Sequence, residues 1–293
     1  MRTLRGDGVV MVTIGVMSVV ALVWNAFVGI VFRTSFLAAL ATALPLFVIS
    51  AIFRRLRPNR LIAEVALYVG LWTLQPVVGV RLTYLANAIG VPLCDHALSA
   101  ADAAIGFHWV DWARFVVAHP WLLRLNGLAY ESYVVQPLLS IFILARWGRP
   151  GANRELLSSI LIAFNITTFV SIFTPAIGPA DAVGFVLPPA GVIHAIRSHA
   201  TTPLDYVGIV SFPSFHTVMA VLFTLAHRNG RVARWFFAAL NVAMLLSTPY
   251  AGAHYLVDVF GGIVVALLSF LVSRRLYAWS GRDVAENRPA KAS

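Results

Sequence analysis

A histidine and an aspartate near the end of the chain have the spacing of a catalytic pair. His254 and Asp258 are four residues apart in an apolar segment. On a helix, this spacing places both side chains on one face, so the carboxylate can accept a hydrogen bond from one ring nitrogen. The other nitrogen keeps its lone pair and can act as a base or a nucleophile. A helix-packing role for the intramembrane carboxylate of Asp258 is the alternative interpretation.

A second polar run, Ser-Phe-Pro-Ser-Phe-His from Ser211 to His216, precedes this pair. Pro213 suits the first turn of a helix, whose free backbone N–H groups favour an anion. Ser214 adds a hydroxyl group and His216 adds an imidazole. The run therefore predicts a phosphate cradle at the start of a helix. An ordinary capped helix with an interfacial histidine is the alternative.

The segments around these residues are rich in apolar side chains. Hydrophobic residues make up 59% of the 293 residues and charged residues 12%, whereas about a quarter of the residues are charged in a typical soluble domain. A bilayer is therefore the expected solvent. The net charge of +10 comes without a basic stripe that alternates with aromatic residues, so we expect no nucleic-acid partner. The single cysteine, Cys94, excludes an intramolecular disulfide and a cysteine-based metal site.

Eight segments are apolar and of about the length needed to cross a bilayer, which is about 20 residues. They are Val9–Phe32, Ser35–Phe53, Leu61–Val80, Leu125–Ala145, Leu156–Gly178, Phe212–His227, Val232–Tyr250 and His254–Val272. Residues 91–119 mix tryptophans with charged side chains, which is typical of a helix lying in the membrane interface. We predict an all-α integral membrane protein with about eight transmembrane helices and an interfacial helix.

The basic residues predict the topology. If the N-terminus is cytoplasmic, all but five of the 22 Lys and Arg residues fall in inner segments, as the positive-inside rule requires. His216 and His254 then both lie near the outer interface. We expect N-terminal transmembrane helices over residues 1–90, a catalytic membrane domain over 91–279, and a disordered cytoplasmic tail over 280–293.

Together, the two polar runs resemble a known family. The string Pro213-Ser214-Phe215-His216 is followed by Ser247 and by Gly252-Ala253-His254-Tyr255-Leu256-Val257-Asp258. This arrangement resembles the type-2 phosphatidic acid phosphatase superfamily of lipid phosphatases. It is most similar to the inositol phosphorylceramide synthase-like branch, which the string from Thr174 to Pro179 also resembles. The resemblance covers about Leu156–Val272, and more weakly Asp102–Ser140.

The resemblance implies a helical core of the phosphatidic acid phosphatase type and a role for each residue. His254 would attack phosphorus to form a phosphohistidine, and Asp258 would orient it. His216 would be the general acid for the leaving alkoxide, and Ser214 would hold phosphate oxygens. This chemistry requires no metal or other cofactor, because fixed cations and helix dipoles carry the charge. The expected partners are a lipid phosphate substrate and the bilayer. The expected location is the bacterial inner membrane, with the active site facing the periplasm or exterior.

Two cations of the family pattern are missing. The only lysine is Lys291 in the tail, so the first motif, which contains a lysine, is absent. Thr248 stands where the third motif usually has an arginine. Phosphoryl transfer needs positive charge near the phosphate. We expect Arg197, the only arginine between residues 181 and 211, to supply it; a role as an interfacial anchor is the alternative.

The resemblance thus implies a membrane lipid phosphatase that works through a phosphohistidine intermediate. If the acceptor is an alcohol in place of water, the protein is a phosphotransferase that moves a phosphorylated headgroup between lipids. An alternative from another class is a proton-coupled transporter that uses Asp258 and the histidines as a relay. Transporters often show inverted repeats, and none is visible in this sequence.

Overall fold

The computed structural model describes residues 2–33, 35–185 and 187–286. Over these residues the chain is all-α, as predicted, with no strand and one isolated bridge between Phe32 and Leu204. The helices are α1 (Arg2–Val28), α2 (Phe36–Arg55), α3 (Arg60–Ala88), α4 (Asp95–Ala104), α5 (Trp109–Ala118), α6 (Pro120–Glu131), α7 (Gln136–Trp147), α8 (Ala152–Phe173), α9 (Pro188–Arg197), α10 (Phe215–Ala226), α11 (Ala233–Ala251) and α12 (Leu256–Glu286). Two 3₁₀ turns, Ser132–Val134 and Asp181–Val183, join some of them.

Each of the eight predicted crossings coincides with helix. Within the described residues, five helices are long and apolar enough to span a membrane: α1, α2, α3, α8 and α12. The pair α6 and α7 makes a sixth span if it is counted as one, although it bends by 54° at the break between the two helices. Helix α10 is apolar but has only 12 residues, and α11 contains polar residues along its length. The integral membrane fold is therefore confirmed, with five or six helices of full spanning character.

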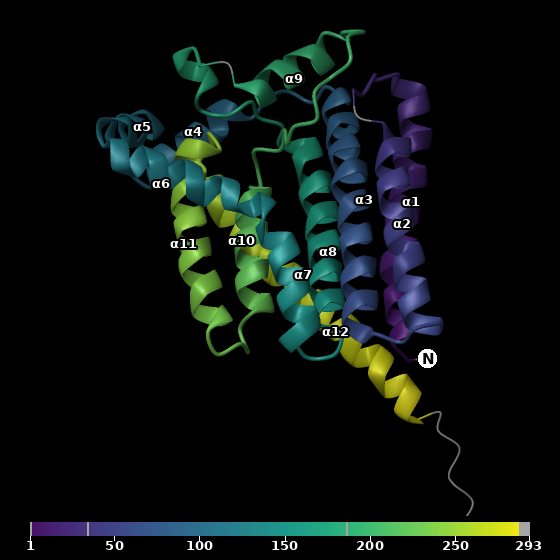
Figure 1. Ribbon diagram of the computed structural model, residues 1–293. Coiled ribbons are helices and arrows are strands. Elements are labelled where there is room, and N and C mark those ends of the chain that lie inside the picture. Colours follow the sequence, from purple (N-terminus) through teal and green to yellow (C-terminus); the bar gives the residue numbers. More distant parts are fainter. Residues whose placement is uncertain (1, 34, 186, 287–293) are drawn as a thin grey trace, which may run out of the picture.

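The helices alternate in direction, so the connections gather at two ends of the bundle (Figure 1). The turns after α2, α7 and α10 lie at the same end as the N-terminus and the end of α12, and arginines lie in each of these turns and in the helix ends beside them. Helices α4, α5 and α9 lie at the opposite end. This arrangement matches the topology that the arginines predict.

Two buried carboxylates tie the arginine-rich end together. Glu155 on α8 pairs with Arg149 and, at 3.0 Å, with Arg228. Asp7 on α1 accepts hydrogen bonds from Tyr68 on α3 at 2.8 Å and from Arg54 on α2 at 3.2 Å. Each carboxylate thus has charged partners that offset its burial.

Helix α12 is longer than expected. It continues to Glu286, so the first part of the tail predicted to be disordered is helical, and residues 287–293 lie outside the described residues. The sequence from Ser280 to Glu286 is polar but contains arginine, alanine and glutamate, which are good helix formers. Polarity alone therefore did not locate the end of the helix.

Two hydrophobic clusters form the core of the bundle. One joins α1, α2 and α3 to α7 and α8. The other joins α7, α8, α10, α11 and α12. Trp72 on α3 and Phe215 at the start of α10 pack against both clusters. The N-terminal helices and the helices that carry the polar runs therefore share one continuous apolar interior.

A pair of glycines lets α12 lie directly against the start of α10. A Cβ atom on Gly262 would lie 2.5 Å from the backbone oxygen of Ser214 and 2.7 Å from Cβ of Thr217. One on Gly261 would lie 2.7 Å from the ring of Phe212. Real Cβ atoms do not approach other atoms so closely, so this helix contact requires glycine.

A carboxylate from α4 caps the start of α12. Asp102 is buried, and its two oxygens accept hydrogen bonds from the backbone N–H groups of Leu256 at 2.8 Å and Val257 at 2.9 Å. The first N–H groups of a helix have no acceptor within the helix. Burial raises the pKa of the Asp102 carboxyl, and the two N–H donors oppose this effect. Helix α4 thus fixes the end of α12 that carries Asp258.

We predict that Gly262→Ala will lower both the midpoint of thermal unfolding in detergent and the catalytic rate. The added methyl group must displace the backbone at Ser214, and overpacking of this kind typically costs about 1–3 kcal/mol. Gly127→Ala on α6 is the matched control, because a Cβ there meets nothing within 4 Å. Equal midpoints and rates for the two variants would contradict the close contact between α10 and α12.

We also predict that Asp102→Ala will lower the unfolding midpoint, because two N–H groups at the start of α12 lose their acceptors, at about 1–3 kcal/mol for each buried group left unpaired. Asp111→Ala is the control, since the Asp111 side chain is 71% exposed and forms an ion pair with the similarly exposed Arg114 on the same helix. Thermal unfolding followed by circular dichroism in detergent checks this prediction. A midpoint for Asp102→Ala that equals the control would show that the cap contributes nothing.

Candidate active site

The predicted histidine–aspartate pair is present, but a turn forms it and not a helix face. His254 precedes α12, which begins at Leu256. Its Nδ1 lies 3.2 Å from Oδ2 of Asp258, which also accepts hydrogen bonds from the hydroxyl of Ser211 at 2.7 Å and the backbone N–H of Tyr255 at 3.0 Å. Asp258 is fully buried and the His254 side chain is only 6% exposed. With Nδ1 directed at the carboxylate, Nε2 of His254 keeps a free lone pair.

The turn that carries His254 is held from two sides. Ala253 has a φ of 47°, and a Cβ on Gly178 would lie 2.7 Å from its carbonyl oxygen. Asp95 on α4 accepts hydrogen bonds from the N–H groups of Ile177 and Gly178, at 3.1 and 2.8 Å, and from the hydroxyl of Tyr255 at 3.1 Å. Burial and the Asp95 carboxylate raise the pKa of Tyr255, so this hydroxyl remains a donor. The position of His254 therefore depends on α4 and on the loop after α8.

Ser214 links the two polar runs. It is the N-cap of α10, with its hydroxyl 3.4 Å from the N–H of Thr217 and its own N–H donating to the backbone oxygen of Asp258 at 3.0 Å. The helix begins at Phe215, so Pro213 lies before it and not in its first turn. The Oγ atom of Ser214 lies 3.5 Å from Nε2 of His254. The free nitrogen of His254 thus faces the positive end of the α10 dipole.

His216 completes the group. Its ring centroid lies 6.2 Å from that of His254. The hydroxyl of Tyr130 on α6 lies 3.0 Å from its Nδ1, the Tyr130 ring stacks on it at 4.3 Å, and Tyr133 meets it edge-on at 4.7 Å. The structure therefore brings together four of the five predicted residues: His254, Asp258, Ser214 and His216.

The structure does not bring the fifth residue, Arg197, to the site. Its guanidinium donates to the backbone oxygen of Val91 at 2.7 Å, and α9 packs on α3. Within the described residues it makes no hydrogen bond or ring contact with either histidine. Thr248 is buried and donates within α11 to the oxygen of Met244. A single arginine in a long loop has no spacing to other site residues from which its position could be predicted. In the structure its guanidinium donates to a backbone carbonyl.

Sequence reasoning missed several residues that hold the site. Ser211 lies at the edge of the polar run, but nothing marked it as a partner of Asp258. Tyr130 lies in a segment predicted to cross the membrane, and Asp95 and Asp102 lie in the segment predicted to be interfacial, so nothing marked them as site residues. Their partners are 82 to 160 positions away in the chain. The one available signal was the placement of Asp95 and Asp102 seven positions apart, which is two helical turns along one face.

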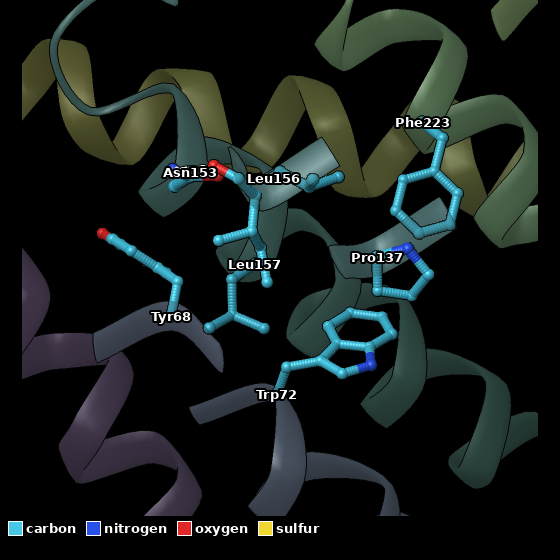
Figure 2. A pocket seen from close by; sticks show the side chains of 8 residues that line it. Tyr68, Trp72, Pro137, Asn153, Leu156, Leu157 and Phe223 are labelled. Carbon is cyan, nitrogen blue, oxygen red and sulfur yellow. Dashed lines mark hydrogen bonds between the residues drawn. The ribbon is translucent and has the colours of Figure 1, made fainter. Parts of the chain in front are cut away.

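A small apolar cavity lies away from the histidines, between α3, α7, α8 and α10 (Figure 2). Its lining residues are Tyr68, Trp72, Pro137, Ile141, Asn153, Leu156, Leu157 and Phe223. None of them belongs to the histidine group, and the lining is almost entirely hydrophobic. This cavity therefore offers no chemistry of its own.

The histidine group is suited to nucleophilic catalysis on an anion. A buried carboxylate orients one imidazole, whose free nitrogen faces a serine hydroxyl and a helix N-terminus, and a second imidazole lies beside it. Within the described residues, no three His, Cys, Asp or Glu side chains form a group that could hold a metal ion. The arrangement therefore fits attack by His254 on a group that the start of α10 binds.

Comparisons with known proteins indicate the class of enzyme. A family model described as the PAP2 superfamily matches residues 96–272, more than half of the chain. The Escherichia coli (strain K12) protein named "Putative undecaprenyl-diphosphatase YbjG" is 28% identical over 172 residues, which is 56% of this chain and 78% of that protein. No solved structure matches. The matches and the apolar helices indicate a membrane enzyme of the phosphatase type, and the chain belongs to the PAP2 superfamily.

Proposed function

We propose that this protein is a membrane lipid phosphatase that hydrolyses phosphate esters through a phosphohistidine on His254. The observation that carries the proposal is the placement of His254, with Nδ1 on Asp258 and Nε2 3.5 Å from the hydroxyl of Ser214 at the start of α10. The relative from Escherichia coli has a name that describes a phosphatase acting on a lipid diphosphate.

In the first step, Nε2 of His254 attacks phosphorus while the bond from phosphorus to the lipid oxygen breaks. The electron pair goes to that oxygen, and protonated His216 gives it a proton. In the second step, water attacks the phosphohistidine, and His216, now neutral, removes a proton from the water. The P–N bond then breaks and its electron pair returns to Nε2 of His254. Asp258 stabilises the positive charge that develops on His254.

The phosphate charge must be balanced without an arginine in contact with these residues. Ser214 and the first N–H groups of α10 donate to the phosphate oxygens, and the imidazolium of His216 provides the positive charge. Arg197 has no part in this scheme. The site lies at the end of the bundle opposite the arginine-rich turns, so in a bacterial inner membrane it faces the periplasm.

We expect His254→Ala to lower the rate of phosphate release from a phospholipid such as phosphatidic acid by about a thousandfold or more, because the nucleophile is lost. Purified protein in detergent and a phosphate assay provide the measurement. His194→Ala on α9 is the control, since that side chain is 56% exposed and lies outside the site. A rate for His254→Ala equal to that of the control would rule out the enzymatic mechanism and favour the transporter alternative.

We further expect ³²P from labelled substrate to remain on protein that is quenched in base, and to be lost in acid, because a P–N bond is labile to acid. Asp258→Asn should accumulate less label than the unchanged protein. No label on rapidly quenched wild-type protein, at a time resolution that captures single turnover, would contradict a covalent intermediate.

Transfer of the phosphorylated group to an alcohol is the second candidate function, because a hydroxyl group that reaches the phosphohistidine can attack it in place of water. The sequence similarity to the inositol phosphorylceramide synthase-like branch favours this test. Phosphatidylinositol with and without ceramide distinguishes the two reactions. Release of inositol phosphate in both cases supports hydrolysis, and a new phosphodiester of ceramide supports transfer.

A further inference from the structure

The two imidazoles of the site are oriented in different ways. His254 has the carboxylate of Asp258 on its Nδ1, at 3.2 Å. His216 has no carboxylate within hydrogen-bonding distance among the described residues, and its one hydrogen bond is between Nδ1 and the hydroxyl of Tyr130, at 3.0 Å. In the proposed mechanism His216 gives a proton to the leaving oxygen and takes one from water. A partner that occupies Nδ1 leaves Nε2 as the nitrogen that can do this.

The Tyr130 hydroxyl can satisfy Nδ1 in both protonation states of His216. When the ring is neutral after giving up its Nε2 proton, Nδ1–H donates to the phenol oxygen and Nε2 holds the lone pair that accepts a proton from water. When the ring is charged, Nδ1–H makes the same hydrogen bond and Nε2 carries the proton for the leaving oxygen. In both states Nε2 is left for the leaving group or the water. The groups that face this ring are Tyr130, Tyr133 and His254, and none of them carries a negative charge at neutral pH.

The break between α6 and α7 places these tyrosines. Helix α6 ends at Glu131 and the 3₁₀ turn Ser132–Val134 follows before α7 begins. Helix α6 packs along α11, and a Cβ on Gly252 after α11 would lie 2.8 Å from the Tyr130 ring and 2.6 Å from His254. Gly252 therefore lets the Tyr130 ring lie close to the turn that carries His254.

We propose that Tyr130 is the positioning residue of His216, holding its Nδ1 so that Nε2 exchanges the proton with the leaving oxygen and with water. This inference rests on the proposed function and extends it to a side chain from α6. Tyr130 does for His216 what Asp258 does for His254, but with a neutral group. Tyr133 contacts the same ring without a hydrogen bond to it, so it serves as the matched control.

The test compares Tyr130→Phe with Tyr133→Phe, using His216→Ala as the reference. Each change of tyrosine removes only a hydroxyl and keeps the ring contacts with His216. Two probes are used: phosphatidic acid, whose leaving alkoxide needs a proton, and para-nitrophenyl phosphate, whose phenolate leaves without one. General acid catalysis contributes about 10²–10⁴-fold, and we expect Tyr130→Phe to lose roughly tenfold or more of the kcat/KM on phosphatidic acid. On the aryl phosphate, the loss of kcat/KM, which reports the steps up to departure of the nitrophenolate, should be less than about threefold. Tyr133→Phe should retain the wild-type rates on both probes.

The pH profile on phosphatidic acid gives a second measurement that needs no aryl substrate. Charged His216 donates to the Tyr130 oxygen, and hydrogen bonds to charged groups are stronger than neutral ones. Without the hydroxyl, the charged form of His216 is less stable. The alkaline limb of the kcat–pH profile should therefore move to lower pH in Tyr130→Phe and remain in place in Tyr133→Phe.

Three outcomes would overturn the inference while the proposed function stands, provided that His254→Ala and His216→Ala are inactive on phosphatidic acid. The first is a Tyr130→Phe protein with wild-type rates and profile. The second is an equal loss on both probes with an unmoved profile, which indicates a structural role. The third is the same behaviour in both tyrosine variants. If His254→Ala and His216→Ala are themselves active, the proposed function fails first.

Discussion

The carboxylate of Asp258 is the interaction on which the site depends. One of its oxygens accepts from the Ser211 hydroxyl and the Tyr255 N–H group and lies 3.2 Å from Nδ1 of His254, while its backbone oxygen accepts from Ser214. One residue therefore joins the loop before α10, the cap of α10, the turn before α12 and α12 itself. A buried carboxylate is costly unless it is bonded in this way. The same bonds that make its burial possible also set the position of His254, the proposed nucleophile.

The rest of the fold can be understood as support for that carboxylate. Gly261 and Gly262 allow α12 to lie against α10, which brings the Asp258 backbone within reach of Ser214. Asp102 satisfies the first N–H groups of α12, and Asp95 holds the neighbouring Tyr255 and the loop after α8. Helix α4 is short and is not among the helices of full spanning length, yet its two carboxylates bind the residues between His254 and Asp258. This helix thus fixes the backbone around the histidine group.

The sequence predicted which polar residues lie together better than how they are held. The structure brings His254, Asp258, His216 and Ser214 together, as their types, their spacing and the predicted membrane topology indicated, and their roles in the reaction stay predictions. The helix face expected for His254 and Asp258 was wrong, because the positive φ of Ala253 forms a turn that polarity patterns do not reveal. The contacts of Tyr130, Asp95 and Asp102 could not be predicted, since each depends on the tertiary packing of segments far apart in the chain. Arg197 was misplaced because electrostatic need alone selected it, with no geometric constraint.

The lack of an arginine in contact with the histidines changes how the reaction must be balanced. In a site with fixed guanidinium groups, the phosphate charge is neutralised whatever the protonation state of the histidines. Here the described partners of the site are hydroxyls, backbone N–H groups and one carboxylate that is already bonded. In the proposed mechanism, the positive charge beside the phosphate comes from a protonated imidazole and from the helix dipole. There the proton on His216 has two tasks, since it offsets the bound anion before it reaches the leaving oxygen. A neutral phenol is a suitable partner for such a ring, because a carboxylate in the position of Tyr130 would cancel the charge that the phosphate requires.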